Sequence, residues 1–166
     1  AAYMGLHLLE REKRACGGQP DPKPKFEGHE YILGRQLKPE ARTDIIERLA
    51  EAGIVPTSMI DITDGLASET LHLCKSSGCG ARIYLDRLPI ARQTHDMAEE
   101  LHADPVVAAL NGGQDYELLF TVPLSKQQEI FALGVDVIGH VTAAGTGAML
   151  VTPDGSEIAL KAPGWK

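Results

Sequence analysis

The sequence has little of what several classes of protein need. Its three cysteines, Cys16, Cys74 and Cys79, lack the paired spacing of a zinc or redox motif, so we expect buried free thiols rather than a disulfide framework or structural zinc. No apolar run approaches the roughly 20 residues of a membrane span. The first residues do not resemble a secretory signal. We therefore expect a cytoplasmic protein that does not bind a membrane.

Positive charge is also scarce. The 16 Lys and Arg residues are outnumbered by 23 Asp and Glu residues, which gives a net charge of −7. A nucleic-acid-binding surface needs clustered basic residues, so no nucleic-acid partner is expected. Neither common nucleotide-binding fingerprint, Gly-x-x-x-x-Gly-Lys-Ser/Thr or Gly-x-Gly-x-x-Gly, occurs in the chain. Any nucleotide must therefore be bound in another way.

The hydrophobic pattern alternates between helical and strand spacing. We expect helices at 1–12, from about 38 to 53, 65–76, 92–102, 105–110 and 125–133, and strands at 58–60, 81–85, 116–122 and 135–141. Residues 17–28, rich in Gly and Pro, predict a loop, and Pro153-Asp154-Gly155 predicts a hairpin between 148–151 and 157–160. The order indicates one α+β domain, with helices packed on one face of a mostly antiparallel sheet.

The segment Asp61-Ile-Thr-Asp-Gly-Leu66 brings two carboxylates and a hydroxyl to a point where a strand gives way to a helix. The start of a helix has unpaired N–H groups and a partial positive charge, so it favours an anion such as phosphate. Asp61 and Asp64 offer the hard oxygen ligands that Mg²⁺ prefers. The segment predicts a metal and phosphate site. Thr63 or Asp64 would equally fit a helix N-cap, and the two roles are compatible.

A second such segment, Gly112-Gly113-Gln114-Asp115-Tyr116-Glu117, stands between a helix and a strand. Glycines permit a left-handed turn or the close approach of a ligand. A helix C-cap followed by a strand edge would explain them equally well. One sheet could bring both strand–helix corners to the same rim, which would assemble a phosphate–metal site.

With these motifs the chain resembles the C-terminal half of the thiamine-monophosphate kinases, relatives of aminoimidazole ribonucleotide synthetase and selenophosphate synthetase. The resemblance rests on residues 59–66, 72–83, 88–89, 110–120 and 35–39 and on the opening helix. It implies the fold of the C-terminal domain of aminoimidazole ribonucleotide synthetase. It also implies ATP- and Mg²⁺-dependent phosphorylation of thiamine monophosphate to thiamine diphosphate.

The resemblance also implies roles for individual residues. Asp61 and Asp64 correspond to Mg²⁺ ligands, Thr63 to a contact with the ATP phosphates, and Gln114 and Trp165 to substrate contacts. In such phosphoryl transfer the metals neutralise the phosphate oxygens, and the protein mainly positions the reacting groups. No side chain of this chain is therefore expected to take a covalent or acid–base part.

Two of these residues depart from the family's usual pattern. Thr63 stands where the family usually has Ser and keeps the hydroxyl group. Gln114 stands where the family usually has Glu, so it keeps a carbonyl acceptor but loses a charge that could complement the cationic thiazolium ring. We expect weaker substrate binding than with Glu at this position.

The resemblance covers only part of an enzyme. The sequence opens on a helical pattern without an initiator Met or a cap, so we expect residues 1–166 to be the single C-terminal domain of a longer two-domain kinase. In this family the N-terminal domain supplies further acidic ligands, most of the ATP pocket and the main homodimer interface. The isolated chain is therefore expected to be inactive. Two alternatives remain: another ATP-using enzyme of the superfamily, and a non-catalytic binding module.

Overall fold

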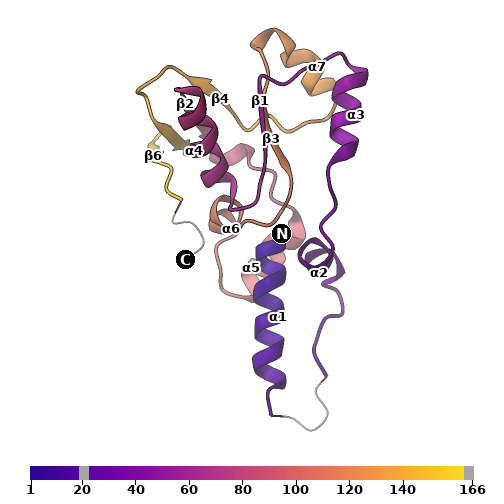
Figure 1. The fold of residues 1–166 in the computed structure, drawn as a ribbon. Coiled ribbons are helices and arrows are strands. Elements are labelled where there is room, and N and C mark those ends of the chain that lie inside the picture. Colours follow the sequence, from indigo (N-terminus) through magenta and orange to yellow (C-terminus); the bar gives the residue numbers. More distant parts are fainter. Residues whose placement is uncertain (19–22, 163–166) are drawn as a thin grey trace.

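The chain folds into helices and short strands that alternate along most of its length (Figure 1). The computed structural model describes residues 1–18 and 23–162, so Trp165 lies outside the described residues. The helices are α1 (Ala2–Cys16), α2 (Glu30–Leu37), α3 (Thr43–Glu51), α4 (Leu66–Ser77), α5 (Arg92–Glu100), α6 (Pro105–Asn111) and α7 (Gln127–Ala132), with 3-10 turns η1 (Leu85–Arg87) and η2 (Leu124–Lys126). The strands are β1 (Ser58–Asp61), β2 (Gly80–Tyr84), β3 (Leu118–Thr121), β4 (Gly139–Thr142), β5 (Ala148–Val151) and β6 (Glu157–Ala159).

The strands form two separate sheets in the described part of the chain. β1 and β3 make an antiparallel ribbon in which Asp61 lies opposite Leu118. The other sheet has the order β4-β2-β5-β6, in which β2 and β5 are parallel and the other neighbours are antiparallel. The α+β class and the mainly antiparallel pairing are thus confirmed, but the strands divide into two sheets where we expected one.

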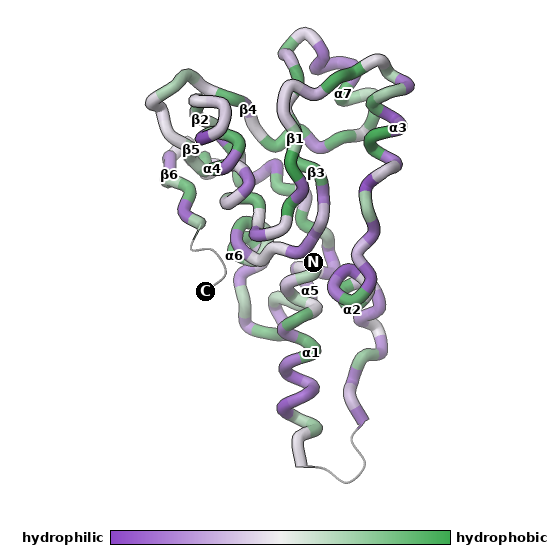
Figure 2. The backbone as a smooth tube through the Cα atoms, in the orientation of Figure 1, coloured by the Kyte–Doolittle hydropathy of each residue, from purple (hydrophilic) through white to green (hydrophobic). Residues whose placement is uncertain are grey.

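The hydrophobic core is divided into three clusters, one for each group of packed elements. The first joins α4 to β2 and β5 through residues such as Leu66, Ile83 and Leu150. The second joins α1, α2, α5 and α6, and the third joins α3 to α7. The β1–β3 ribbon joins the first and third clusters, because Leu119 packs on the first and Met59 and Phe120 pack on the third. Apolar residues run along β1 (Figure 2).

α1 and α2 pack closely because a glycine removes the side chain between them. A Cβ atom on Gly5 would lie 2.5 Å from the carbonyl oxygen of Ile32, which is closer than any real contact. Met4 and Leu8, one helical turn apart on α1, are then completely buried against α2 and α5. This packing holds α2 beside the start of α1 (Figure 1).

Several predicted boundaries were wrong for identifiable reasons. We expected a helix from about Lys38, but α2 ends at Leu37 and α3 begins at Thr43. Lys38 precedes Pro39, and a residue before proline is disfavoured in the helical region. β3 begins two residues later than expected because Tyr116 has a φ of 52°, which no strand residue adopts. β4 begins at Gly139 rather than at 135.

The hairpin expectation is confirmed. The predicted hairpin joins β5 to β6, and its Asp154 carboxylate accepts a hydrogen bond from the Ser156 N–H at 3.2 Å. We expected buried free thiols, but only Cys74 of the three free cysteines is buried, and Cys16 and Cys79 are half-buried. Burial raises the pKa of Cys74 to about 11, so that the thiol stays protonated. Within the described residues, no helix has the length and apolar character that crossing a membrane requires.

Candidate functional site: two joined corners

The first corner lies between β1 and α4. Asp61 ends β1 and is exposed, Thr63 is half-buried, and Asp64 is exposed. Gly65 turns the chain into α4 with a φ of 115°, and a Cβ atom there would lie 2.6 Å from the Leu110 carbonyl oxygen and 2.9 Å from the Asn111 Cα. Glycine is therefore required for α4 to start against the end of α6, which leaves both aspartates facing solvent.

The interpretation of Thr63 or Asp64 as a side-chain N-cap is wrong. Gly65 occupies the N-cap position of α4, and no side chain caps the helix there. Glu69, on the first turns of α4, instead accepts hydrogen bonds on Oε1 from the Thr63 hydroxyl at 3.2 Å and from the Asp64 N–H at 3.1 Å. Sequence reasoning missed Glu69. An acidic residue that reaches back from the start of a helix, as in a capping box, is the signal that could have found it.

The second corner is joined to the first through backbone hydrogen bonds. The Gln114 N–H donates to the Thr63 carbonyl at 2.7 Å, and the Tyr116 N–H donates to the Ile62 carbonyl at 3.0 Å. A Cβ atom on Gly113 would lie 2.3 Å from the Thr63 carbonyl oxygen. The expectation that one sheet brings the two corners together is confirmed, and that sheet is the two-stranded β1–β3 ribbon. The C-cap interpretation of Gly112 is also confirmed, because its N–H bonds to the Ala108 carbonyl at the end of α6.

The second corner is strained. Gln114 and Tyr116 have φ values of 58° and 52°, in the left-handed region that residues with a Cβ atom rarely adopt. Each such residue costs on the order of 1–3 kcal/mol and persists only when its surroundings fix it. Here the hydrogen bonds to Ile62 and Thr63 fix both residues. This backbone conformation sets the direction in which the Gln114 side chain points.

The Gln114 side chain has a protein partner that the sequence did not reveal. Its Oε1 accepts a hydrogen bond from Gln36 Nε2, at the end of α2, at 2.9 Å. One lone pair of the Gln114 carbonyl is therefore engaged, and its second lone pair and the amide NH₂ group remain for a ligand. The Oε1 atom of Gln36 is buried and has no hydrogen-bond partner in the part of the chain that the structure describes. Sequence reasoning missed the contact because the two residues are 78 positions apart in the chain.

Two arginines hold the segment that follows Gln114. Arg35 donates to the Asp115 carbonyl and forms an ion pair with Glu117 at 2.8 Å, and Arg42 pairs with the same carboxylate. Hydrogen bonding to Asp44, followed by the charge of Glu117, raises the pKa of Arg42 against the lowering effect of burial. The negative charge of Glu117 is therefore compensated by protein groups and does not face a ligand unpaired.

The two aspartates fit a metal that is shared with other ligands. Across residues 1–18 and 23–162, no group of three or more His, Cys, Asp or Glu side chains is arranged to hold a metal ion. Mg²⁺ is commonly bound by one or two carboxylates together with waters and substrate phosphates. Asp61 and Asp64, both exposed at one corner, match that pattern. They fit part of a metal site that needs further ligands to be complete.

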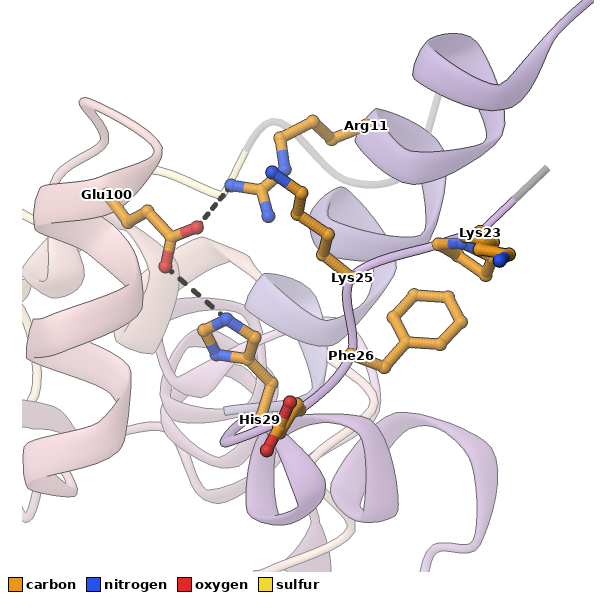
Figure 3. A pocket seen from close by; sticks show the side chains of 8 residues that line it. Arg11, Lys23, Lys25, Phe26, His29 and Glu100 are labelled. Carbon is orange, nitrogen blue, oxygen red and sulfur yellow. Dashed lines mark hydrogen bonds and ion pairs between the residues drawn. The ribbon is translucent and has the colours of Figure 1, made fainter. Parts of the chain in front are cut away.

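A separate hollow lies between α1, the segment that follows it and α5. Its side chains include Arg11, Lys25, Phe26, His29 and Glu100 (Figure 3). Glu100 pairs with Arg11 at 2.6 Å and its other oxygen lies 3.5 Å from His29, so the charge of Arg11 is already compensated. This hollow contains none of the predicted site residues.

Comparison with known proteins places the chain in a family. Residues 4–152 match the model of the AIR synthase related protein, C-terminal domain. The chain is 32% identical to the thiamine-monophosphate kinase of Aquifex aeolicus over 163 residues, which cover 98% of the chain and 46% of that protein. It is 38% identical to the Escherichia coli (strain K12) thiamine-monophosphate kinase over 82% of the chain and 41% of that protein.

Solved structures agree with this assignment. AaThiL complexed with AMPPCP and TMP matches 99% of the chain and 47% of that structure, at 30% identity and a TM-score of 0.73. The E. coli hydrogenase maturation protein HypE matches with a TM-score of 0.63 at 23% identity, which shows a common fold alone. The chain spans less than half of the length of each of these relatives. It belongs to the family of the AIR synthase related protein, C-terminal domain.

Proposed function

We propose that this chain is the C-terminal half of a thiamine-monophosphate kinase, which transfers a phosphoryl group from ATP to thiamine monophosphate. The observation that carries the proposal is the joining of the two corners, because it brings two exposed carboxylates next to Gln114. The names of the relatives and the nucleotide and TMP of the AaThiL complex support the same reaction.

In this proposal Asp61 and Asp64 hold Mg²⁺ together with ligands from the rest of the enzyme. When bound, the metal neutralises charge on the phosphate oxygens and orients them for in-line transfer. Thr63 lies between the two aspartates and contacts the bound metal–nucleotide. The contribution of this corner is to fix the positions of these oxygen atoms before the nucleotide arrives.

The second corner contacts thiamine monophosphate. Gln114 offers the second lone pair of its carbonyl and its amide NH₂ group, because Gln36 occupies only one lone pair of the carbonyl. The strained backbone and the two arginines keep this amide in one place. Trp165 remains a second predicted substrate contact, with the stacking role that the resemblance implies.

The remaining parts of the enzyme belong to an N-terminal domain of the same polypeptide. That domain would supply the other metal ligands, most of the ATP pocket and a homodimer interface in a cytoplasmic enzyme. The isolated chain would then lack kinase activity. The incomplete ligand set at Asp61 and Asp64 supports this division of the site.

A thermal-shift experiment distinguishes this kinase from a non-catalytic binding module. Thiamine diphosphate should raise the melting temperature of the full-length protein in the presence of Mg²⁺, and the increase should disappear with EDTA or in Asp61→Ala. A module whose acidic corner serves only for packing would show the same shift with and without Mg²⁺ and in the variant. That result would refute the proposed metal site.

A further inference from the structure

Glu69 carries a buried carboxylate beside the first corner. Glu69 is 2% exposed, although it lies only eight residues beyond the exposed end of β1. Its Oε1 accepts both the Thr63 hydroxyl and the Asp64 N–H, whereas its Oε2 is buried and has no hydrogen-bond partner among the described residues. Burying a carboxylate is costly unless it is hydrogen-bonded. A residue that only packed α4 would not need this charge.

The geometry fixes the direction of the hydrogen bond at Thr63. The Asp64 N–H can only donate, so Glu69 Oε1 serves as an acceptor, and the Thr63 hydroxyl at 3.2 Å also donates to it. A hydroxyl has one proton and two lone pairs. With its proton directed to Glu69, Thr63 can offer only lone pairs to a ligand at the corner.

This direction decides which ligand the hydroxyl suits. A phosphate oxygen accepts hydrogen bonds and needs a donor, whereas a divalent cation needs the lone pairs of an oxygen atom. We propose that Glu69 is a positioning residue that orients Thr63 as an oxygen ligand for the cation held by Asp61 and Asp64. This inference rests on the proposed function for the identity of the nucleotide and deepens it. The predicted contact of Thr63 with the ATP phosphates then runs through the metal.

The same oxygen of Glu69 also fixes the backbone of Asp64. By holding the Asp64 N–H and the Thr63 hydroxyl together, Glu69 sets the spacing of two neighbouring ligand groups. Residues that hold metal ligands in place typically change metal affinity by about 10–100-fold when they are removed. We expect Glu69 to act in this way without touching the metal.

The test measures Mn²⁺ affinity of the full-length protein by calorimetry, with a non-hydrolysable ATP analogue present. Glu69→Leu should weaken Mn²⁺ binding by at least about tenfold. Glu69→Gln should restore the affinity to within about threefold of wild type, because its carbonyl can accept both hydrogen bonds. Thr70→Val is the matched control, since the Thr70 hydroxyl donates to the Leu66 carbonyl within α4 at 2.7 Å and has no other partner among residues 1–18 and 23–162. It should lower the melting temperature and leave Mn²⁺ affinity unchanged.

A metal-preference experiment tests Thr63 directly and does not depend on the stability of Glu69→Leu. Thiolates prefer softer metals than hydroxyl oxygens do. Thr63→Cys should therefore raise the ratio of Cd²⁺ to Mg²⁺ affinity by at least about tenfold, whereas Thr63→Ser should keep the wild-type ratio. A Thr63→Cys protein with the wild-type ratio would overturn the inference, as would a folded Glu69→Leu protein with wild-type Mn²⁺ affinity.

The outcomes separate this inference from the proposed function. If Mn²⁺ binding follows the expected pattern but the protein makes no thiamine diphosphate, the kinase proposal fails and the cation role of Thr63 stands. If the protein makes thiamine diphosphate but Thr63→Cys keeps the wild-type metal preference, the inference alone fails.

Discussion

The two corners of the site are held in place by different means. The Asp61–Asp64 corner is fixed by Glu69, a residue of the helix that follows directly, and it presents two carboxylates to solvent. The Gly112–Glu117 corner is fixed by Gln36, Arg35 and Arg42, which are 75 to 82 residues away in the chain. Both carboxylates of this corner are engaged by protein groups: Glu117 by the two arginines, and Asp115 by the N–H of Ala2 at 3.1 Å.

Metal binding and substrate binding at this site therefore depend on different parts of the chain. The metal-binding character of the first corner follows from the residue types that are adjacent there in the sequence. The orientation of the Gln114 side chain instead depends on tertiary contacts with α2 and the segment after it. We therefore expect changes in the first corner to affect metal-dependent chemistry. Changes in the second corner should affect stability and substrate affinity.

The largest effect should come from removing a carboxylate of the first corner. Asp64→Ala in the full-length enzyme should lower kcat/KM by at least about 100-fold, because a bound metal supplies several kcal/mol of charge stabilisation in phosphoryl transfer. Steady-state kinetics over a range of Mg²⁺ concentrations measure this. Asp86→Ala, which removes an exposed carboxylate from η1, is the control and should keep wild-type activity. Equal activity of the two variants would rule out the metal role.

The next effect should come from the contact between the corners. Gly113→Ala places a Cβ atom 2.3 Å from the Thr63 carbonyl at a φ of 68°, so the free energy of unfolding should fall. The left-handed conformation alone costs about 1–3 kcal/mol. Gly155→Ala has a similar φ of 84° but no atom within 4 Å of the new Cβ. Urea denaturation should show a clearly larger loss for Gly113→Ala, and equal losses would mean that the corners are not in contact.

The smallest effect should come from the charge at the second corner. Gln114→Glu adds a carboxylate that can still accept from Gln36 and can complement the thiazolium ring, so thiamine monophosphate should bind about three- to tenfold more tightly. That gain corresponds to no more than about 1.4 kcal/mol, as expected for a partly exposed charge pair. Gln128→Glu, on the exposed side of α7, is the matched control. Calorimetry that finds the same affinity for Gln114→Glu and wild type would contradict this reading.

The sequence predicted much of the first corner because its signals are local. An apolar strand, two aspartates, a glycine and a helical spacing are adjacent in the chain, and the structure brings them together as β1, the corner and α4. The prediction of an N-cap failed because Gly65 occupies that position and Glu69 binds the Thr63 hydroxyl instead. The partner of this hydroxyl depends on the turn that Gly65 makes between Thr63 and α4, with a φ of 115°.

Less of the second corner could be predicted from the sequence. The two glycines indicated a turn, but the contact with Gln36 arises only because Gly5 lets α2 pack closely against α1. α2 itself was missed, since it is eight residues long, contains Gly34 and buries Ile32 as its fully buried residue. Short helices take most of their stability from packing rather than from intrinsic propensity. The metal ligands Asp61 and Asp64 and the substrate contacts Gln114 and Trp165 stay predictions.

The most direct test is the formation of thiamine diphosphate by the full-length protein. The assay contains ATP, Mg²⁺ and thiamine monophosphate, and separates the products by chromatography. We expect turnover that is lost in Asp61→Asn and absent for residues 1–166 alone. Turnover by the isolated chain would contradict the division of the site between two domains. If a folded full-length protein showed no turnover, the kinase assignment would be contradicted. If Asp61→Asn kept full turnover, the metal role of this corner would be contradicted.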